Sequence, residues 1–170
     1  MRFGVVGLVF LLFAASSALS DGHYTDDLEG VEAKFIADGD TASINIRLYG
    51  IDAPESDQLC ERNDESCWKC GERAQEVLSG LIKGQEATFL FTGEVTWGRP
   101  VATIKVGAMD INKEMVRQGY AVVFPRFLTP AMKTDYLAAE DDAKSAERGI
   151  WQGDFVMPWD WRSGERLSCE

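Results

Sequence analysis

Apolar residues alternate with polar ones, or gather in short β-rich runs, at five places along the chain. These predicted strands cover residues 31–37, 44–48, 87–92, 101–106 and 120–124. The turn sequence Asp38-Gly39-Asp40 separates the first two strands and predicts a β-hairpin. In the second strand Ile44, Ile46 and Leu48 alternate with polar residues, so these three are expected to build the core and Arg47 is expected on the opposite face.

Helical spacing of apolar residues marks three further segments. They cover residues 72–83, 112–118 and 130–146. Asn112 is predicted as the N-cap of the second helix, and Thr129, followed by Pro130, as the N-cap of the third. Five short strands interspersed with three helices predict the α+β class, with a five-stranded OB-fold-type β-barrel flanked by three α-helices, rather than a parallel α/β sheet.

The first residues have the order of a secretory signal. Arg2 precedes the apolar run 3–15, and small residues then lead to Ser20, where cleavage is expected. The run is shorter than the roughly 18 residues that a bilayer span needs. The predicted organisation is a signal peptide (1–20), an N-terminal segment (21–30), one folded domain (31–152) and a C-terminal tail that packs on it (153–170). The mature protein is expected to be secreted or periplasmic, with no membrane contact.

In an oxidising compartment the four cysteines are able to form disulfides. Cys60, Cys67, Cys70 and Cys169 allow three complete pairings. Cys60 with Cys70 is the preferred disulfide, which leaves Cys67 to pair with Cys169 or to stay free. Zinc binding is disfavoured because there is one CxxC pair only, and the single histidine, His23, is distant in sequence. A thiol oxidoreductase lacks the expected βαβ context.

Charge and length limit the function classes. The chain has 170 residues, 18.8 kDa and a formal net charge of -11, so one domain is expected, as a monomer. Such an acidic protein does not attract nucleic acid over its whole surface. Any site for phosphate must therefore be local.

Carboxylates are the strongest candidates for chemistry. Asp40 closes the first turn, and Asp52-Ala53-Pro54-Glu55 follows the second strand, so a hairpin and a bend together can bring these oxygens to one hard cation, calcium or magnesium. Taken singly, each segment is more often a plain turn or a capped loop. Serine-hydrolase chemistry is unsupported, because the chain has no Gly-x-Ser-x-Gly segment and no internal histidine.

Several motifs occur together in one order. They are Asp38-Gly39-Asp40-Thr41, Arg47-Leu48-Tyr49-Gly50-Ile51-Asp52-Ala53-Pro54-Glu55, Trp97-Gly98-Arg99, Ile111-Asn112-Lys113-Glu114-Met115-Val116-Arg117-Gln118-Gly119 and Ala146-Glu147-Arg148-Gly149-Ile150-Trp151. In this order the chain resembles the staphylococcal nuclease, or thermonuclease-like, family over about residues 31–151. The resemblance implies an OB-fold enzyme that hydrolyses the phosphodiester bonds of DNA and RNA with Ca2+.

The resemblance also implies roles for individual residues. Asp40 and Asp52 would bind the ion through their side chains and Ala53 through its carbonyl. Asp38 would support these ligands without binding the ion itself. Glu55 would be the general base, and Arg47 and Arg99 would bind the phosphate. These seven residues are the predicted metal and catalytic set.

A wall of aromatic residues completes the predicted site. Phe124 and Phe127 offer faces on which a base can stack, although core packing is an equal or better interpretation for Phe124. The alternative to an enzyme is a noncatalytic OB-fold module that binds an oligonucleotide or a protein partner. Glu55, Arg47 and Arg99 discriminate between the two, because a binding module does not need them.

Overall fold

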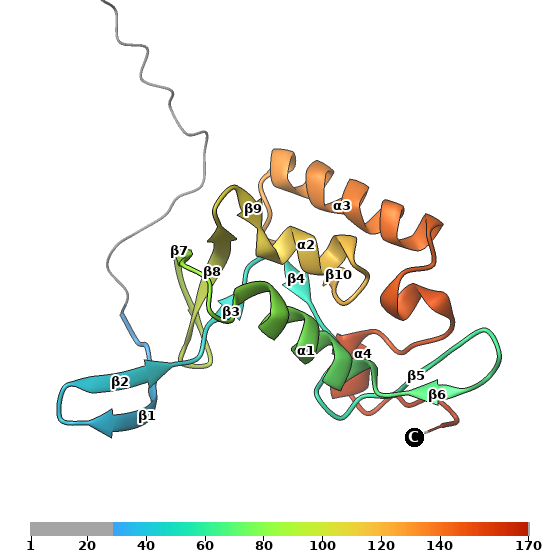
Figure 1. The fold of residues 1–170 in the computed structure, drawn as a ribbon, viewed down its shortest axis with the longest axis horizontal. Helices are drawn as coiled ribbons and strands as arrows, with labels where there is room; N and C mark the ends of the chain where they lie inside the picture. Colours follow the sequence, from blue (N-terminus) through green and yellow to red (C-terminus); the bar gives the residue numbers. More distant parts are fainter. Residues whose placement is uncertain (1–28, 170) are drawn as a thin grey trace, which may run out of the picture.

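The computed structural model describes residues 29–169, so the predicted signal peptide lies outside the described residues. Figure 1 shows short, separate sheets, some beside the helices and some between them. The strands are β1 Ala33–Asp38, β2 Thr41–Ile44, β3 Arg47–Leu48, β4 Ile51–Asp52, β5 Cys60–Glu61, β6 Cys67–Trp68, β7 Ala87–Thr96, β8 Arg99–Val106, β9 Met109–Asp110 and β10 Val122–Val123. The α-helices are α1 Cys70–Ile82, α2 Ile111–Arg117, α3 Pro130–Ser145 and α4 Pro158–Arg162, and a 3-10 turn spans Gly149–Gln152.

The mixture of sheets and helices agrees with the predicted α+β class, but the barrel differs from the prediction. β8 is central to the largest sheet, where it pairs antiparallel with β7 and β9 and parallel with β3. β4 pairs with β10 instead, and β1 pairs with β2 alone. Within residues 29–169 the strands therefore form separate sheets and not a closed five-stranded barrel, because the β1–β2 hairpin adds its edges to no other strand. In the described part of the chain four α-helices, not three, accompany these sheets.

The hairpin itself forms as the turn sequence predicts, but it stands away from the rest of the fold (Figure 1). Every residue of β1 and β2 is exposed, including Phe35 at 62% and Ile36 at 61%. Ile44 is 40% exposed, so its predicted place in the core is wrong. Alternation fixes which side chains share a face, but it does not fix what covers that face.

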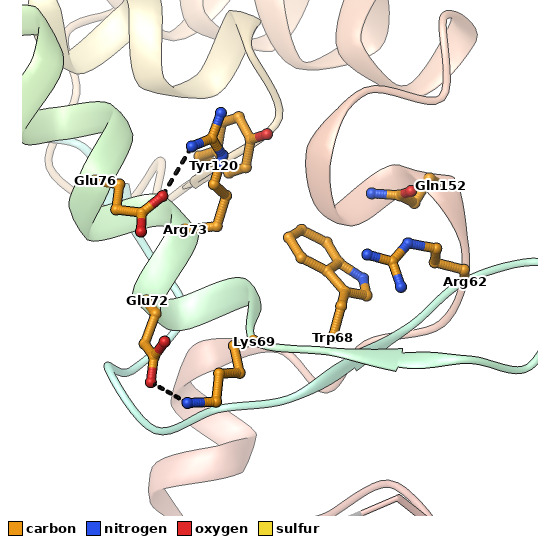
Figure 2. A pocket seen from close by; sticks show the side chains of 8 residues that line it. All are labelled: Arg62, Trp68, Lys69, Glu72, Arg73, Glu76, Tyr120 and Gln152. Carbon is orange, nitrogen blue, oxygen red and sulfur yellow. Dashed lines mark hydrogen bonds and ion pairs between the residues drawn. The ribbon is translucent and has the colours of Figure 1, made fainter.

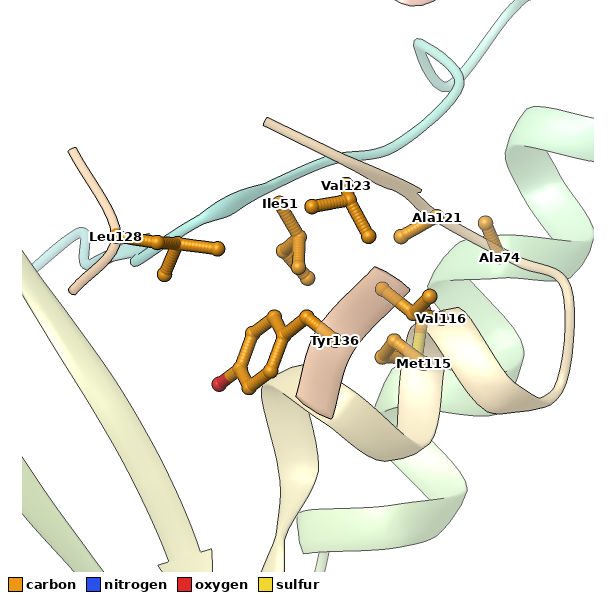
Figure 3. Packing of buried hydrophobic residues seen from close by; sticks show 8 residues of the cluster. All are labelled: Ile51, Ala74, Met115, Val116, Ala121, Val123, Leu128 and Tyr136. Atoms are coloured by element: carbon orange, nitrogen blue, oxygen red, sulfur yellow. The ribbon is translucent and has the colours of Figure 1, made fainter. Parts of the chain in front are cut away.

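The main core lies between β4, β10 and the first three α-helices (Figure 3). Its buried members are Ile51, Ala74, Met115, Val116, Ala121, Val123, Leu128 and Tyr136. Tyr136 is 1% exposed and donates through its hydroxyl to the carboxylate of Asp110, at 3.1 and 3.0 Å. Burial of the Tyr136 ring thus leaves its one polar group satisfied, as burial in a core requires.

Asp110, not Asn112, caps helix α2. The side chain of Asp110 accepts from the backbone N–H of Lys113 at 3.0 Å. Asn112 is fully buried and instead links the backbones around it. Its amide donates to the carbonyls of Tyr49 and Ala102 at 3.0 and 3.1 Å and accepts from the N–H of Ile104 at 3.1 Å. The predicted N-cap is thus a buried cross-link between β3, β8 and α2.

The C-terminal segment packs on a second buried cluster. Cys60, Cys70, Val122 and Ile150 form its centre. The aromatic and apolar side chains packed against them are Trp68, Trp151, Phe155, Met157 and Trp159. Helix α4 follows directly, beginning with the buried Pro158. Over residues 29–169 no helix is both long and apolar enough to cross a bilayer.

Candidate active site

Asp52 is held rigidly at the end of β4. The backbone turns at Gly50, whose φ is +74°. A Cβ added at Gly50 would lie 2.2 Å from the Leu128 side chain. The Gly50 carbonyl accepts from the N–H of Phe124 at 2.9 Å, and Asp52 then pairs with Val122 of β10. Glycine is required here because any side chain at this φ is strained and would overlap Leu128.

Glu55 is positioned by the start of helix α1. A Cβ at Gly71 would lie 1.7 Å from the carbonyl oxygen of Glu55, so glycine alone permits this approach. The fully buried Gln58 accepts from the Glu55 N–H at 3.2 Å and donates to the carbonyl of Val156 at 2.7 Å. One amide side chain therefore connects the Glu55 loop to the C-terminal segment.

The predicted disulfide between Cys60 and Cys70 is present, and both residues are fully buried. It closes the loop that follows Glu55 onto the first residue of α1. Cys67 and Cys169 keep free thiols. A hydrogen bond with the Cys67 thiol is the main cause that raises the pKa of Cys169 to about 11.

Four charged groups meet beside β4. Arg162 of α4 donates through Nη2 to Asp52 Oδ2 at 2.6 Å and through Nη1 to Asp52 Oδ1 at 3.1 Å. The same Nη1 donates to Glu55 Oε1 at 2.8 Å, and Arg47 Nη2 lies 3.8 Å from Asp52 Oδ1. The hydrogen bonds to Asp52 are the main cause that raises the pKa of Arg162, with Glu55 adding to it.

A cavity of about 310 Å³ opens next to this group. It is lined by residues from β3, β4, β7, β8, the loop after β10 and α4: Arg47, Leu48, Tyr49, Gly50, Ile51, Glu94, Thr96, Trp97, Val101, Phe124, Phe127 and Arg162. Two arginines and four aromatic rings thus share one hollow. A phosphate with an attached base has this combination of charge and flat apolar surface.

Phe124 and Phe127 face this cavity in different ways. Phe124 is half-buried, with ring centroids 6.2 Å from Phe127 and 6.0 Å from Trp159. Phe127 is 49% exposed, and the Arg126 guanidinium lies 5.4 Å from its ring centroid. Phe127 therefore offers the more open face, while Phe124 also packs against the C-terminal segment.

Two of the predicted site residues lie elsewhere, and a third lies near the cavity without lining it. Asp38 and Asp40 belong to the exposed β1–β2 turn. Hydrogen bonding by Asp40, whose backbone N–H donates to Asp38 Oδ1 at 3.3 Å, is the main cause that lowers the pKa of Asp38, with Thr41 as a second cause. Arg99 begins β8 and pairs with Thr96, which lines the cavity, but Arg99 is not itself a lining residue. The structure therefore brings together Arg47, Asp52 and Glu55, with Ala53 between the last two.

The donor atoms at this centre suit a hard cation in kind. Asp52 and Glu55 offer carboxylate oxygens, the ligands that calcium prefers. In their present arrangement, however, three of these oxygens accept hydrogen bonds from Arg162. Among residues 29–169 no three His, Cys, Asp or Glu side chains are grouped so as to hold a metal. A cation at Asp52 would have to take the place of a guanidinium.

A second cavity, of about 380 Å³, lies at the N-terminal end of α1 (Figure 2). It holds three cationic side chains, two of which are neutralised by neighbours on the same helix turn. Lys69 pairs with Glu72 at 2.6 Å and Arg73 with Glu76 at 2.8 Å. The third, Arg62, lies 5.4 Å from the Trp68 ring centroid. This cavity therefore has much less unpaired positive charge than its arginines and lysine suggest.

The residues grouped at Asp52 fall within a segment that matches a known protein family. A model of the family described as "Staphylococcal nuclease homologue" matches residues 45–153. The chain belongs to the staphylococcal nuclease family. The matched region contains Arg47, Asp52, Glu55 and Arg99, and it begins after the β1–β2 hairpin. Family membership implies an OB-type fold.

Individual proteins are also similar to this one over most of the chain. An "Uncharacterized endonuclease" of Haemophilus influenzae is 28% identical over 142 residues, 78% of this chain and 72% of that protein. A protein of the same description from Escherichia coli O157:H7 is 29% identical over 136 residues, 75% of this chain and 80% of its own length. The probable staphylococcal-like nuclease CAN3 of Oryza sativa subsp. japonica is 30% identical over 122 residues, 71% of this chain and 29% of the rice protein.

Arg162 is the residue of this site that sequence reasoning missed. The segment Pro158-Trp159-Asp160-Trp161-Arg162 suggests packing through its tryptophans, and the arginine follows as an ordinary helix-terminal charge. Its contact with Asp52 spans 110 positions of sequence. The one available signal was the presence of an arginine at the end of a segment expected to pack near the site.

Proposed function

We propose that this protein is a calcium-dependent nuclease that hydrolyses the phosphodiester bonds of DNA and RNA. The observation that carries the proposal is the grouping of Arg47, Asp52 and Glu55 beside a cavity with aromatic walls in a member of the staphylococcal nuclease family. Relatives described as endonucleases support the same activity. Export to a periplasm or medium, and action as a monomer, belong to the proposal as expectations from the sequence.

Glu55 is the proposed general base. Its side chain is 38% exposed, so water reaches the carboxylate, and an ionised carboxylate can take the proton of an attacking water. Its backbone is held from both sides by Gly71 and Gln58, which keeps the carboxylate in one place beside the cavity. A fixed base is more effective than a mobile one because the reacting geometry is prepared in advance.

Arg47 is the proposed phosphate ligand at this centre. Its guanidinium lines the cavity and lies 3.8 Å from Asp52, so the carboxylate orients it without using all of its N–H groups. A guanidinium donates to two phosphate oxygens at once and stays charged. Charge accumulates on those oxygens as water attacks, and Arg47 stabilises it.

Calcium would be held by the Asp52 carboxylate, the Ala53 carbonyl and Asp40, with Asp38 supporting Asp40. When bound, the ion would stabilise negative charge on the phosphate oxygens. Asp40 can join only if the β1–β2 hairpin moves toward β4, which is also the movement that a closed OB-type barrel needs. Calcium titration of Asp40→Asn tests this assignment: about tenfold weaker binding is expected, since one charged ligand is lost, and unchanged affinity would remove Asp40 from the site.

The decisive experiment incubates purified protein with linear DNA and with RNA, in calcium and in chelator. The DNA and the RNA are expected to be cleaved in the presence of calcium and to stay intact in chelator. Glu55→Gln keeps the shape of the side chain and is expected to slow cleavage by roughly 10²–10⁴-fold, with an unchanged thermal unfolding midpoint. Full activity of Glu55→Gln would show that the base is assigned wrongly. Oligonucleotide binding without any cleavage would instead support the noncatalytic module.

A further inference from the structure

The guanidinium of Arg162 contacts three of the four oxygens of the two central carboxylates. Nη1 and Nη2 each donate to one oxygen of Asp52, at 3.1 and 2.6 Å, and Nη1 also donates to Glu55 Oε1 at 2.8 Å. The contact with Asp52 is the paired, forked geometry in which arginine binds carboxylates most strongly. The two Asp52 oxygens are also those that a divalent cation would need.

Because Asp52 is buried, its contact with Arg162 decides how the charge of its carboxylate is compensated. The Asp52 side chain is 8% exposed, so it relies on protein groups rather than water for compensation. Arg162 and Arg47 supply two positive charges against the two carboxylates, and the group is neutral as it stands. A divalent ion added at the same oxygens would lie against the Arg162 guanidinium and be repelled by it.

We infer that Arg162 is a tethered cation that competes with the divalent metal ion for the Asp52 carboxylate. The inference rests on the proposed calcium dependence. The ion and the guanidinium oppose each other because both are drawn to the two Asp52 oxygens, which Arg162 occupies as a fork. Metal binding at this centre therefore includes the displacement of the Arg162 side chain.

The C-terminal segment is attached firmly enough to make this competition effective. Pro158 is buried, and Trp159 packs on Phe124 with ring centroids 6.0 Å apart. Gln58 ties Val156 to the same loop that carries Glu55. A group held in place beside its partner acts at a high effective concentration. Arg162 itself is 39% exposed, so its side chain can leave the carboxylates while the helix stays docked.

Displacement leaves the guanidinium next to a suitable partner. Arg162 lines the same cavity as Arg47, where the proposed substrate places an anionic phosphate. Exchange of a carboxylate for a phosphate keeps Arg162 paired, so metal binding costs less than the loss of a salt bridge would suggest. The competition is thus expected to be stronger without substrate than with it.

The test is calcium binding by isothermal titration calorimetry, without nucleic acid, to the full chain and its variants. Arg162→Gln is expected to bind CaCl2 about tenfold more tightly than the native protein, which corresponds to one charge-assisted hydrogen bond. Arg162→Lys is expected to fall between them, because an ammonium group cannot fork across both Asp52 oxygens. Unchanged or weaker calcium binding by Arg162→Gln would overturn the inference.

Arg73→Gln is the matched control. Arg73 also pairs with a glutamate, at 2.8 Å, but it lies on α1 beside the second cavity, so its removal changes the net charge equally. Its calcium affinity is expected to stay within about twofold of the native value, as for a screened distant charge. An equal gain in Arg73→Gln and Arg162→Gln would show a general charge effect and overturn the competition.

A readout on the native chain avoids any effect of substitution on folding. In 15N NMR the Arg162 guanidinium signals, assigned by their loss in Arg162→Lys, are expected to shift and broaden as calcium is added. Signals that stay fixed while calorimetry shows calcium bound would overturn the displacement. Calcium binding by neither native protein nor Arg162→Gln would overturn it too. Absence of nuclease activity with calcium binding and displacement intact would count against the proposed function alone.

Discussion

The acidic turn at Asp40 and the acidic bend at Asp52 have similar sequences but opposite surroundings. Among the described residues Asp40 hydrogen-bonds to its turn neighbours Asp38 and Thr41, on a hairpin whose strand residues are all exposed. Asp52 is 8% exposed and contacts Arg47 and Arg162, which come from β3 and α4. A short acidic motif fixes a local turn, whereas its chemistry depends on which distant segments surround it.

The largest expected difference in stability between the two regions comes from adding a Cβ at a glycine in each. Gly71→Ala places a Cβ 1.7 Å from the Glu55 carbonyl oxygen, so the helix and the loop must part, and the free energy of unfolding should fall by about 3 kcal/mol. Gly39→Ala in the hairpin turn meets nothing within 4 Å and should change it by less than about 0.5 kcal/mol. Urea denaturation measures both. Equal stabilities would mean that Glu55 is not held against α1.

Loss of one carboxylate charge should give a smaller difference in the free energy of unfolding between the two regions. Asp52→Asn leaves Arg162 and Arg47 without their shared partner, and should cost about 2 kcal/mol, less than a fully buried pair because Arg162 is partly exposed. Asp40→Asn, on the exposed turn, should cost less than about 0.5 kcal/mol. The same urea experiment, without calcium, compares them. A comparable loss in Asp40→Asn would mean that the hairpin already packs on the centre before metal binds.

The thiol of Cys169 tests whether the far end of the C-terminal segment is also held. Contact with Cys67 raises the pKa of Cys169 to about 11, from 9.0. A raised folded-state pKa favours the protonated thiol, so this stabilisation is complete below about pH 9 and disappears between pH 9 and 11. Iodoacetamide should label Cys169 more slowly at pH 8.5 than it labels the same residue in urea. Equal labelling rates would show that the two thiols do not meet.

Much of the local structure is readable from the sequence. Thr129 and Pro130 open α3 as predicted, the Asp38-Gly39-Asp40 turn makes its hairpin, and Cys60 pairs with Cys70. In each case the signal and the structure it produces lie within a few residues. Asn112 shows the limit, since a good capping residue by type becomes a buried cross-link once β3 and β8 surround it.

By itself, the sequence determined the family, the local turns and helices, and the candidates Arg47, Asp52 and Glu55, because their spacing follows from covalent connection and backbone geometry. Tertiary structure alone decided that the hairpin edges pair with no other strand among residues 29–169 and that Arg162 reaches Asp52 across 110 positions. Such contacts depend on packing between distant segments. Gln58 and Trp159, which dock α4 beside Glu55, stabilise that arrangement without any pattern in the nearby sequence.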